Sequence, residues 1–260
     1  MTAGIALRGV GIDFPTRAGT FTALKEIDAL IPEGSFTTLL GPSGCGKSTL
    51  LRIIADILAP TSGSVDLSGR TPAEARHDGE FGFVFQDPVL LPWRTARQNV
   101  ELPLQAVRMG RKERRARADE LLHLVGLDGF EDNPPAKLSG GMARRVAIAR
   151  ALAMSPRVLF LDEPFSGLDE LRRQQMNDEL QRIWMETGTT AILVTHNVGE
   201  AVYLSDEVFV MAPRPGRIIA QHGIDLPRPR TTDIVHTPEF LAIEEELTAL
   251  LRTAYGSSDE

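Results

Sequence analysis

The order of apolar and polar residues along the chain predicts an α/β protein. Helical spacing of apolar residues runs through 48–58 and again through 170–187, where Gly188 is expected to end the helix. Compact apolar runs predict strands at 35–41, 81–86, 158–162 and 190–196. The last two runs are apolar almost throughout, which is typical of parallel strands covered on both faces.

The remaining segments predict antiparallel strands at the start, helices in the middle and a helix at the end. Residues 5–14 and 21–31 predict short, partly antiparallel strands, and 62–69 another hairpin piece. A helical pattern fills about 98–155, and 205–220 predicts two strands joined by a PRPG turn. The final helix is expected to have Thr237 as N-cap, Pro238 at its first position, and one apolar face of Phe240, Ile243, Leu247 and Leu250.

Composition narrows the class of protein. The 260 residues are 42% hydrophobic and carry a formal net charge of −7, so we expect a globular protein that does not bind nucleic acid. Cys45 is the only cysteine, which gives no sign of an oxidising compartment. The sequence predicts neither a membrane helix nor a signal peptide, so we expect a cytoplasmic location.

A glycine-rich loop between a predicted strand and a predicted helix carries the strongest chemical signal. Its backbone N–H groups are suited to phosphate oxygens, Lys47 to the β- and γ-phosphates, and the Ser48 hydroxyl to Mg²⁺. The alternative is an ordinary glycine turn before a helix. The nucleotide-binding residues predicted here are Gly41, Pro42, Ser43, Gly44, Cys45, Gly46, Lys47, Ser48 and Thr49.

Two carboxylates follow the apolar run at 158–162. Carboxyl ends of strands are where α/β sheets bind ligands. Asp162 is predicted to hold Mg²⁺, through water, and Glu163 to act as general base on the attacking water. Acidic residues commonly follow strands, so this pair alone is weak evidence for a Mg²⁺ site. It becomes strong evidence in combination with the glycine-rich loop.

A second glycine-rich segment, LSGG at 138–141, also opens a helical pattern. Its N–H groups and Ser139 are suited to an anion, although the first loop already surrounds the phosphates. In this combination the chain resembles an ATP-binding cassette (ABC) protein, the ATPase subunit of ABC transporters, over essentially its whole length. The resemblance rests on GPSGCGKST, Gln86, LSGG, VLFLDEP, SGLD at 166–169 and His196.

The resemblance implies that two copies pack head to tail, so that Ser139, Gly140 and Gly141 of one chain close over the ATP of the other. It also implies that Gln86 contacts Mg²⁺ and the attacking water, and that Asp169 contacts the opposite cassette. It also gives His196 a contact with the γ-phosphate, although a core histidine ending a strand is the alternative. Phe14 is a candidate for stacking on adenine or equally a strand core residue, since the family usually has Tyr there.

The implied fold is a P-loop NTPase core of RecA type with an N-terminal antiparallel β subdomain and an inserted helical subdomain. We expect N-terminal strands and the first half of the core at 1–87, the helical subdomain at 88–157, the second half at 158–226, and a short tail at 227–260. Because this tail is short, we expect no added regulatory domain. Met142 departs from the family's LSGGQ pattern and puts a ribose hydrogen bond in doubt.

Three stretches narrow the resemblance to importer cassettes for nitrate, sulfonate, taurine and bicarbonate: 84–104, 138–152 and 200–218. Such systems use a separate membrane permease and a separate solute-binding protein, and place the cassette on the cytoplasmic face of the membrane. Leu90, Leu91, Pro92 and Trp93 are either a groove for a permease helix or core residues beneath the helical block. The alternative functions are a soluble ABC-type ATPase without a permease and an importer of a different small solute.

Two smaller features have simple interpretations. The basic run at 111–117 alternates with acidic residues and predicts a solvated helix face. Cys45 lies beside Lys47 at a helix start, which favours a reactive thiolate, the alternative being a small filler residue.

Overall fold

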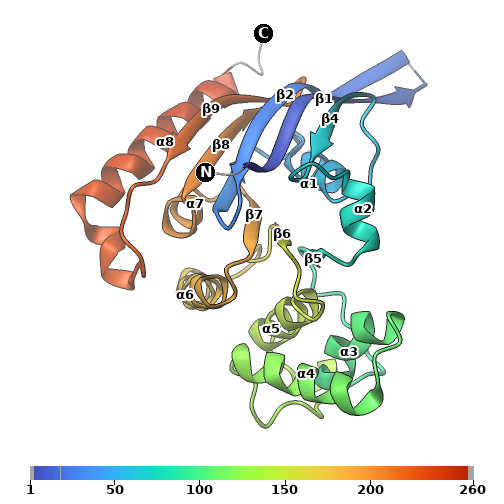
Figure 1. The fold of residues 1–260 in the computed structure, drawn as a ribbon. Coiled ribbons are helices and arrows are strands. Elements are labelled where there is room, and N and C mark those ends of the chain that lie inside the picture. Colours follow the sequence, from blue (N-terminus) through green and yellow to red (C-terminus); the bar gives the residue numbers. More distant parts are fainter. Residues whose placement is uncertain (1–2, 18, 257–260) are drawn as a thin grey trace. The chain divides into compact units, whose positions relative to one another are not determined.

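A computed structural model describes residues 3–17 and 19–256 and divides the chain into two compact units (Figure 1). The first unit runs up to Asp78 and resumes at Thr190, and the second comprises Gly79–Thr189. Residues 1–2 and 257–260 belong to the first and last of the four predicted segments, 1–87 and 227–260, and lie outside the described residues.

An antiparallel sheet opens the first unit, with strand order β2-β1-β4. β1 (Ala3–Thr16) and β2 (Gly19–Pro32) pair antiparallel, as predicted, but at 14 residues each they are longer than the short strands expected. Register shifts along the pair mark bulges, which blur the alternation that a regular strand shows in sequence. β4 (Ser62–Asp66) pairs antiparallel with β1, which is distant in sequence, and is not part of a local hairpin.

The core of the first unit lies at a second group of strands, in the order β7-β3-β8-β9. β3 (Phe36–Leu40) pairs in parallel with β7 (Thr190–Thr195) and β8 (Glu207–Ala212), and every residue of β3 and β7 is buried. This confirms the prediction for 190–196. β9 (Arg217–Gly223) runs antiparallel to β8, as the turn at 213–216 predicts.

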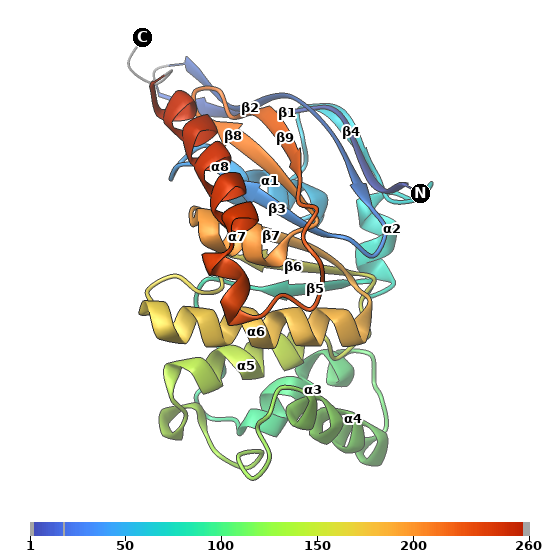
Figure 2. The same cartoon turned by 90° about the vertical axis from the view of Figure 1, so that its left-hand side faces the viewer.

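The first unit's helices follow local signals closely. α1 (Lys47–Ile54) follows β3. The sequence reasoning missed α2 (Pro72–His77), although Thr71 and Glu74 form a capping box ahead of it. α7 (Val198–Leu204) and α8 (Pro238–Gly256) pack against each other, and α8 also packs on β8 (Figure 2).

The start of α8 is as predicted, because the Phe240 backbone N–H donates to the Thr237 hydroxyl oxygen at 3.3 Å. Of the predicted apolar face, Phe240 and Leu247 are buried and Ile243 and Leu250 are half-buried, while Leu251, next to Leu250, is buried. A helix turns by 100° per residue, so one step moves a side chain from the edge of a face to its centre.

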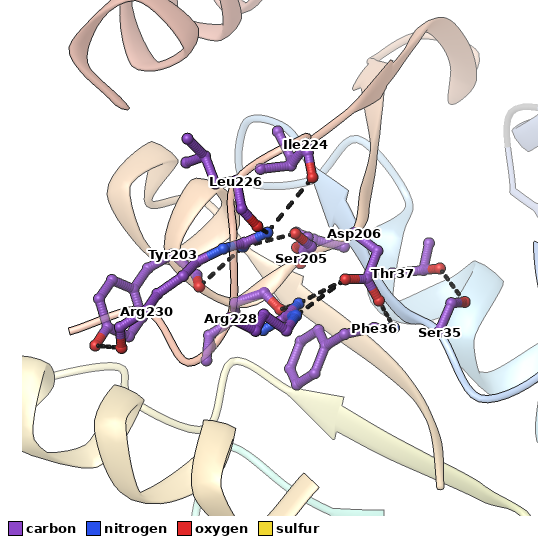
Figure 3. Close-up of polar contacts among 12 residues, drawn as sticks. Ser35, Phe36, Thr37, Tyr203, Ser205, Asp206, Ile224, Leu226, Arg228 and Arg230 are labelled. Atoms are coloured by element: carbon purple, nitrogen blue, oxygen red, sulfur yellow. Dashed lines mark hydrogen bonds and ion pairs between the residues drawn. The ribbon is translucent and has the colours of Figure 1, made fainter. Parts of the chain in front are cut away.

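A buried arginine fastens the segment before α8 to the end of α7 (Figure 3). Arg230 donates through Nη1 to the carbonyl oxygens of Val202, Tyr203 and Ser205 at 2.7, 3.0 and 2.7 Å. Cations at a helix C-terminus satisfy its last carbonyl groups. Burial lowers the pKa of Arg230 to about 10, which still leaves it charged at neutral pH.

The second unit is mainly helical. β5 (Phe81–Val84) and β6 (Val158–Asp162) pair in parallel, and α3 (Ala96–Ala106), α4 (Arg111–Leu124) and α5 (Gly140–Ala151) pack together, with a 3-10 turn at Pro135–Lys137. α6 (Glu170–Thr187) ends at Gly188, whose φ of 63° is the left-handed cap that the sequence predicts. The first residues of α4 are exposed apart from half-buried Arg114 and Arg117, in line with the predicted solvated face.

Candidate functional site

The first glycine-rich loop joins β3 to α1 in the first unit. Gly44 and Gly46 have φ values of 79° and 99°, a region that favours glycine. Gly41 needs its small size, because a Cβ there would lie 2.7 Å from the Met211 carbonyl oxygen. Helix α1 begins without a side-chain cap and without an acidic residue in its first turn, so its N-terminus presents backbone N–H groups and positive potential. This arrangement is suited to an anion.

Lys47 lies inside this loop with only 4% of its surface exposed. Its Nζ donates to the carbonyl oxygens of Gly41 and Pro42 at 2.8 and 2.9 Å. The ammonium group therefore sits within the curve of the loop. Of the other loop residues, Ser43 and Gly44 are exposed, Ser48 and Thr49 are half-buried, and Pro42 is buried.

Cys45 does not fit the prediction of a reactive thiolate. The side chain is 1% exposed, and burial raises the pKa of its thiol despite the nearby charge of Lys47. A Cβ on Gly41 would lie 2.8 Å from Cys45 Sγ, so the sulfur fills the inside of the loop. The structure thus favours the other interpretation, a small filler residue.

His196 is exposed at the carboxyl end of β7, next to the glycine-rich loop. Leu40 and Thr195 are partners in the parallel pair of β3 and β7, and Gly41 and His196 directly follow them. The exposure excludes the alternative of a core histidine. The structure therefore brings two predicted site elements together at one edge of one sheet, as expected for ligand binding in α/β proteins.

A short hydrogen-bonded turn fixes the chain on either side of His196. The Thr195 hydroxyl donates to Glu200 Oε2 at 2.6 Å, and the Asn197 backbone N–H donates to Thr195 Oγ1 at 3.0 Å. Asn197 also caps α7, since its Oδ1 accepts from the Glu200 N–H at 2.8 Å. The sequence reasoning missed Asn197 and Glu200, although Asn-x-x-Glu before an apolar helix is a capping signal.

The second unit gathers Gln86, Asp162 and Glu163. Val84 and Leu161 are partners in the parallel pair of β5 and β6. Gln86 and the two carboxylates therefore lie at the same edge of this pair, where both strands end. Asp162 is buried and Glu163 half-buried, with a positive φ of 46° that is unusual for a residue other than glycine. Gln86 is exposed, and its Nε2 donates to Ser166 Oγ at 3.3 Å.

The second glycine-rich segment starts α5. Ser139 is the N-cap, and its hydroxyl oxygen accepts from the Met142 N–H at 3.3 Å. Ser139 and Gly140 are exposed, and neither Gly140 nor Gly141 has an atom within 4 Å of where a Cβ would lie. An open helix N-terminus with accessible N–H groups is suited to an anion from outside the unit.

The remaining predicted residues are Asp169, Phe14 and those of the segment after Gln86. Asp169 is the exposed N-cap of α6, accepting from the Arg172 N–H at 3.0 Å. Phe14 is half-buried on β1, opposite Phe21 of β2, which leaves both interpretations of Phe14 open. In the segment after Gln86, Leu90 and Leu91 are half-buried, but Trp93 is 75% exposed and so is not a core residue.

Comparison with known proteins decides the family. The family described as ABC transporter matches residues 24–166. The chain belongs to the ABC transporter family. It is 45% identical over 246 residues to the taurine import ATP-binding protein TauB of Rhizobium johnstonii, with 92% of this chain and 93% of that protein covered. It is 44% identical over 238 residues to the nitrate import ATP-binding protein NrtC of Synechococcus elongatus, with 90% of this chain but 36% of that protein covered.

A solved structure extends the likeness to the fold. A dimeric ATP-binding cassette in a post-hydrolysis state bound to ADP and Pi matches with a TM-score of 0.75 and 33% identity, over 86% of this chain and all of that one. The chain of 260 residues therefore has the predicted α/β ATPase fold and is an ATP-binding ABC-type ATPase. Within residues 3–17 and 19–256, no helix has both the length and the apolar content to cross a bilayer.

Proposed function

We propose that this ABC ATPase drives the import of a small anionic solute such as a sulfonate, taurine or nitrate. The observation that carries the proposal is the 45% identity to a taurine import ATP-binding protein over nearly the full length of both chains. The nitrate import relative is 44% identical, so these identities do not distinguish one small anionic solute from another.

The first unit supplies the phosphate-binding half of the proposed site. The loop from Gly41 to Thr49 would bind the ATP phosphates through its N–H groups, with Lys47 as the nearby positive charge. His196, at the same sheet edge, would contact the γ-phosphate. Phe14 is retained as the candidate for stacking on adenine.

The second unit supplies the hydrolytic half. Asp162, with Ser48 and Gln86, would hold Mg²⁺; these are oxygen donors of the type Mg²⁺ prefers, and Mg²⁺ sites usually combine one or two carboxylates with substrate phosphates. Bound Mg²⁺ would neutralise charge on the phosphates. Glu163 would accept the proton of the attacking water.

A second copy of the chain would complete each site. The chain has one P-loop and one LSGG segment, and the helix start at Ser139, Gly140 and Gly141 is exposed or half-buried, with open space beside both glycines. In a head-to-tail dimer this N-terminus would close over the γ-phosphate bound by the partner, and Asp169 would contact the opposite chain. Twofold pairing would give two identical sites.

A membrane permease would be the other partner, with the cassette on the cytoplasmic face of the membrane and a solute-binding protein reached only through the permease. The exposed indole of Trp93, close after Gln86, supports contact with a permease helix there. Large exposed aromatic side chains are enriched at protein interfaces.

Growth and copurification test the proposal in the source organism. A deletion strain should lose uptake of one labelled anion among taurine, alkanesulfonates and nitrate, and the plasmid-borne gene should restore it. A tagged chain should copurify with an integral membrane subunit. Normal uptake of all of these solutes would contradict the proposed substrate class and favour an importer of a different small solute. Purification of the chain without any membrane subunit would favour a soluble ABC-type ATPase instead.

A further inference from the structure

The backbone between Gln86 and α3 is held by side chains from other elements. Arg150, in the last turn of α5, donates from Nη2 to the Pro88 carbonyl oxygen and from Nη1 to the Val89 carbonyl oxygen, both at 2.8 Å. One planar guanidinium therefore grips two successive peptide groups, a geometry that lysine cannot reproduce. Arg150 itself is half-buried, and this burial lowers the pKa of its guanidinium.

The gripped turn is strained. Val89 has a φ of 43°, in the left-handed region that a β-branched residue rarely adopts. Its side chain is 61% exposed, so packing of the valine does not compensate for the strain. Strained residues persist where surrounding contacts over-determine them. The two hydrogen bonds from Arg150 are such contacts.

The far end of the same segment is fixed to α3. Asn99 is fully buried, and its Oδ1 accepts from the Leu91 N–H at 2.8 Å. Its Nδ2 donates to the carbonyl oxygens of Arg94 and Thr95 at 3.3 and 2.9 Å. The segment 87–95 is thus anchored at both ends, with the Trp93 side chain exposed between the anchors.

Helix α5 has a second connection to Gln86. Arg144 Nη2 donates to the Ser166 carbonyl oxygen at 2.5 Å, and Ser166 Oγ accepts from Gln86 Nε2 at 3.3 Å. Along one helix, Ser139 lies at the open N-terminus, Arg144 near Gln86 and Arg150 at the turn that follows it. Helix α5 therefore contacts Pro88 and Val89 directly and is connected to Gln86 through Ser166.

We propose that Arg150 is a positioning residue that locks the strained turn after Gln86 to α5, so that Gln86, segment 87–95 and Ser139 move as one body. The proposal rests on the proposed function for its effect on hydrolysis. The lock itself is a property of the isolated chain. Without it, Val89 leaves the left-handed region and Gln86 loses its fixed place relative to α5.

Native-state proteolysis tests the lock without reference to ATP. In Arg150→Met, chymotrypsin should cleave after Leu91 or Trp93 at least tenfold faster than in wild type, as followed by mass spectrometry. Arg150→Lys keeps the charge and should show an intermediate rate. The matched control is Arg117→Met, which removes a half-buried arginine that donates to Ser155 Oγ at 3.0 Å, and should stay within twofold of wild type.

Kinetics then separate positioning from general damage. Arg150→Met should lower kcat for ATP at least tenfold with KM within threefold, because the phosphate-binding loop is unchanged. Adding Val89→Gly should recover at least threefold of the lost kcat, since glycine adopts a positive φ without strain. If Arg150→Met does not fold, Arg150→Lys carries both measurements.

The proposal is overturned if the folded Arg150 variants are cleaved at the wild-type rate, or if Val89→Gly recovers none of the lost kcat. An absence of ATPase activity in wild type would count against the proposed function, while the proteolysis result would still decide the lock.

Discussion

The substitution Lys47→Met tests the proposed phosphate site, and the expected loss of ATP affinity follows from the contacts of the Lys47 ammonium group. Two phosphate groups at about 4 Å from the ammonium would each contribute about 4 kcal/mol at an effective dielectric constant of about 20. Against this, Nζ must give up its bonds to Gly41 and Pro42, at 2.8 and 2.9 Å. Two hydrogen bonds to a charged group amount to about 3–6 kcal/mol.

The net effect is therefore a loss of about 2–5 kcal/mol of ATP binding, or about 30- to 4,000-fold in Kd. Titration calorimetry with Mg²⁺ and a slowly hydrolysed ATP analogue measures it. Lys112→Met, at an exposed position of α4, is the matched control and should stay within twofold of wild type. A change below threefold in Lys47→Met would refute the assignment of this loop to the phosphates.

Two substitutions and one labelling experiment test other parts of the site. Glu163→Gln keeps size and should lower kcat by about 10²–10⁴ while ATP still binds, measured by phosphate release; turnover within threefold of wild type contradicts the general-base role. Ser139→Arg should abolish hydrolysis but leave nucleotide affinity of the monomer within threefold, and undiminished turnover would refute phosphate capture by LSGG. Cys45 should react with a maleimide at least 100-fold more slowly in the native protein than in urea, and fast native labelling would contradict its raised pKa and burial.

Elements set by local pattern were the most predictable from sequence. The glycine-rich loop, α1 and the left-handed cap at Gly188 depend on residues within a few positions of one another. Pairing between distant segments was harder. The neighbourhood of Gly41 and His196 depends on the register of β3 with β7, about 150 residues apart in the chain, which neither segment encodes alone.

The sequence does not show which side chains are buried or which of them bond to distant backbone groups. The wrong or missing predictions concern these two properties. Cys45 has the neighbours of a reactive thiol, but desolvation outweighs the charge of Lys47. Arg150 and Arg230 look like ordinary surface arginines in sequence. Their roles come from backbone carbonyl groups that only the folded chain brings within reach. Trp93 is the opposite case, a large apolar residue that the fold leaves exposed.

If one chain holds only half of each catalytic centre, hydrolysis of ATP requires two chains. This requirement is tested by measuring ATPase activity per chain across a dilution series in which sedimentation also reports the mass. Activity per chain should fall as the dimer dissociates into chains of 28.4 kDa, and should approach zero for the monomer. A monomer that hydrolyses ATP at a constant rate per chain throughout the series would contradict the account.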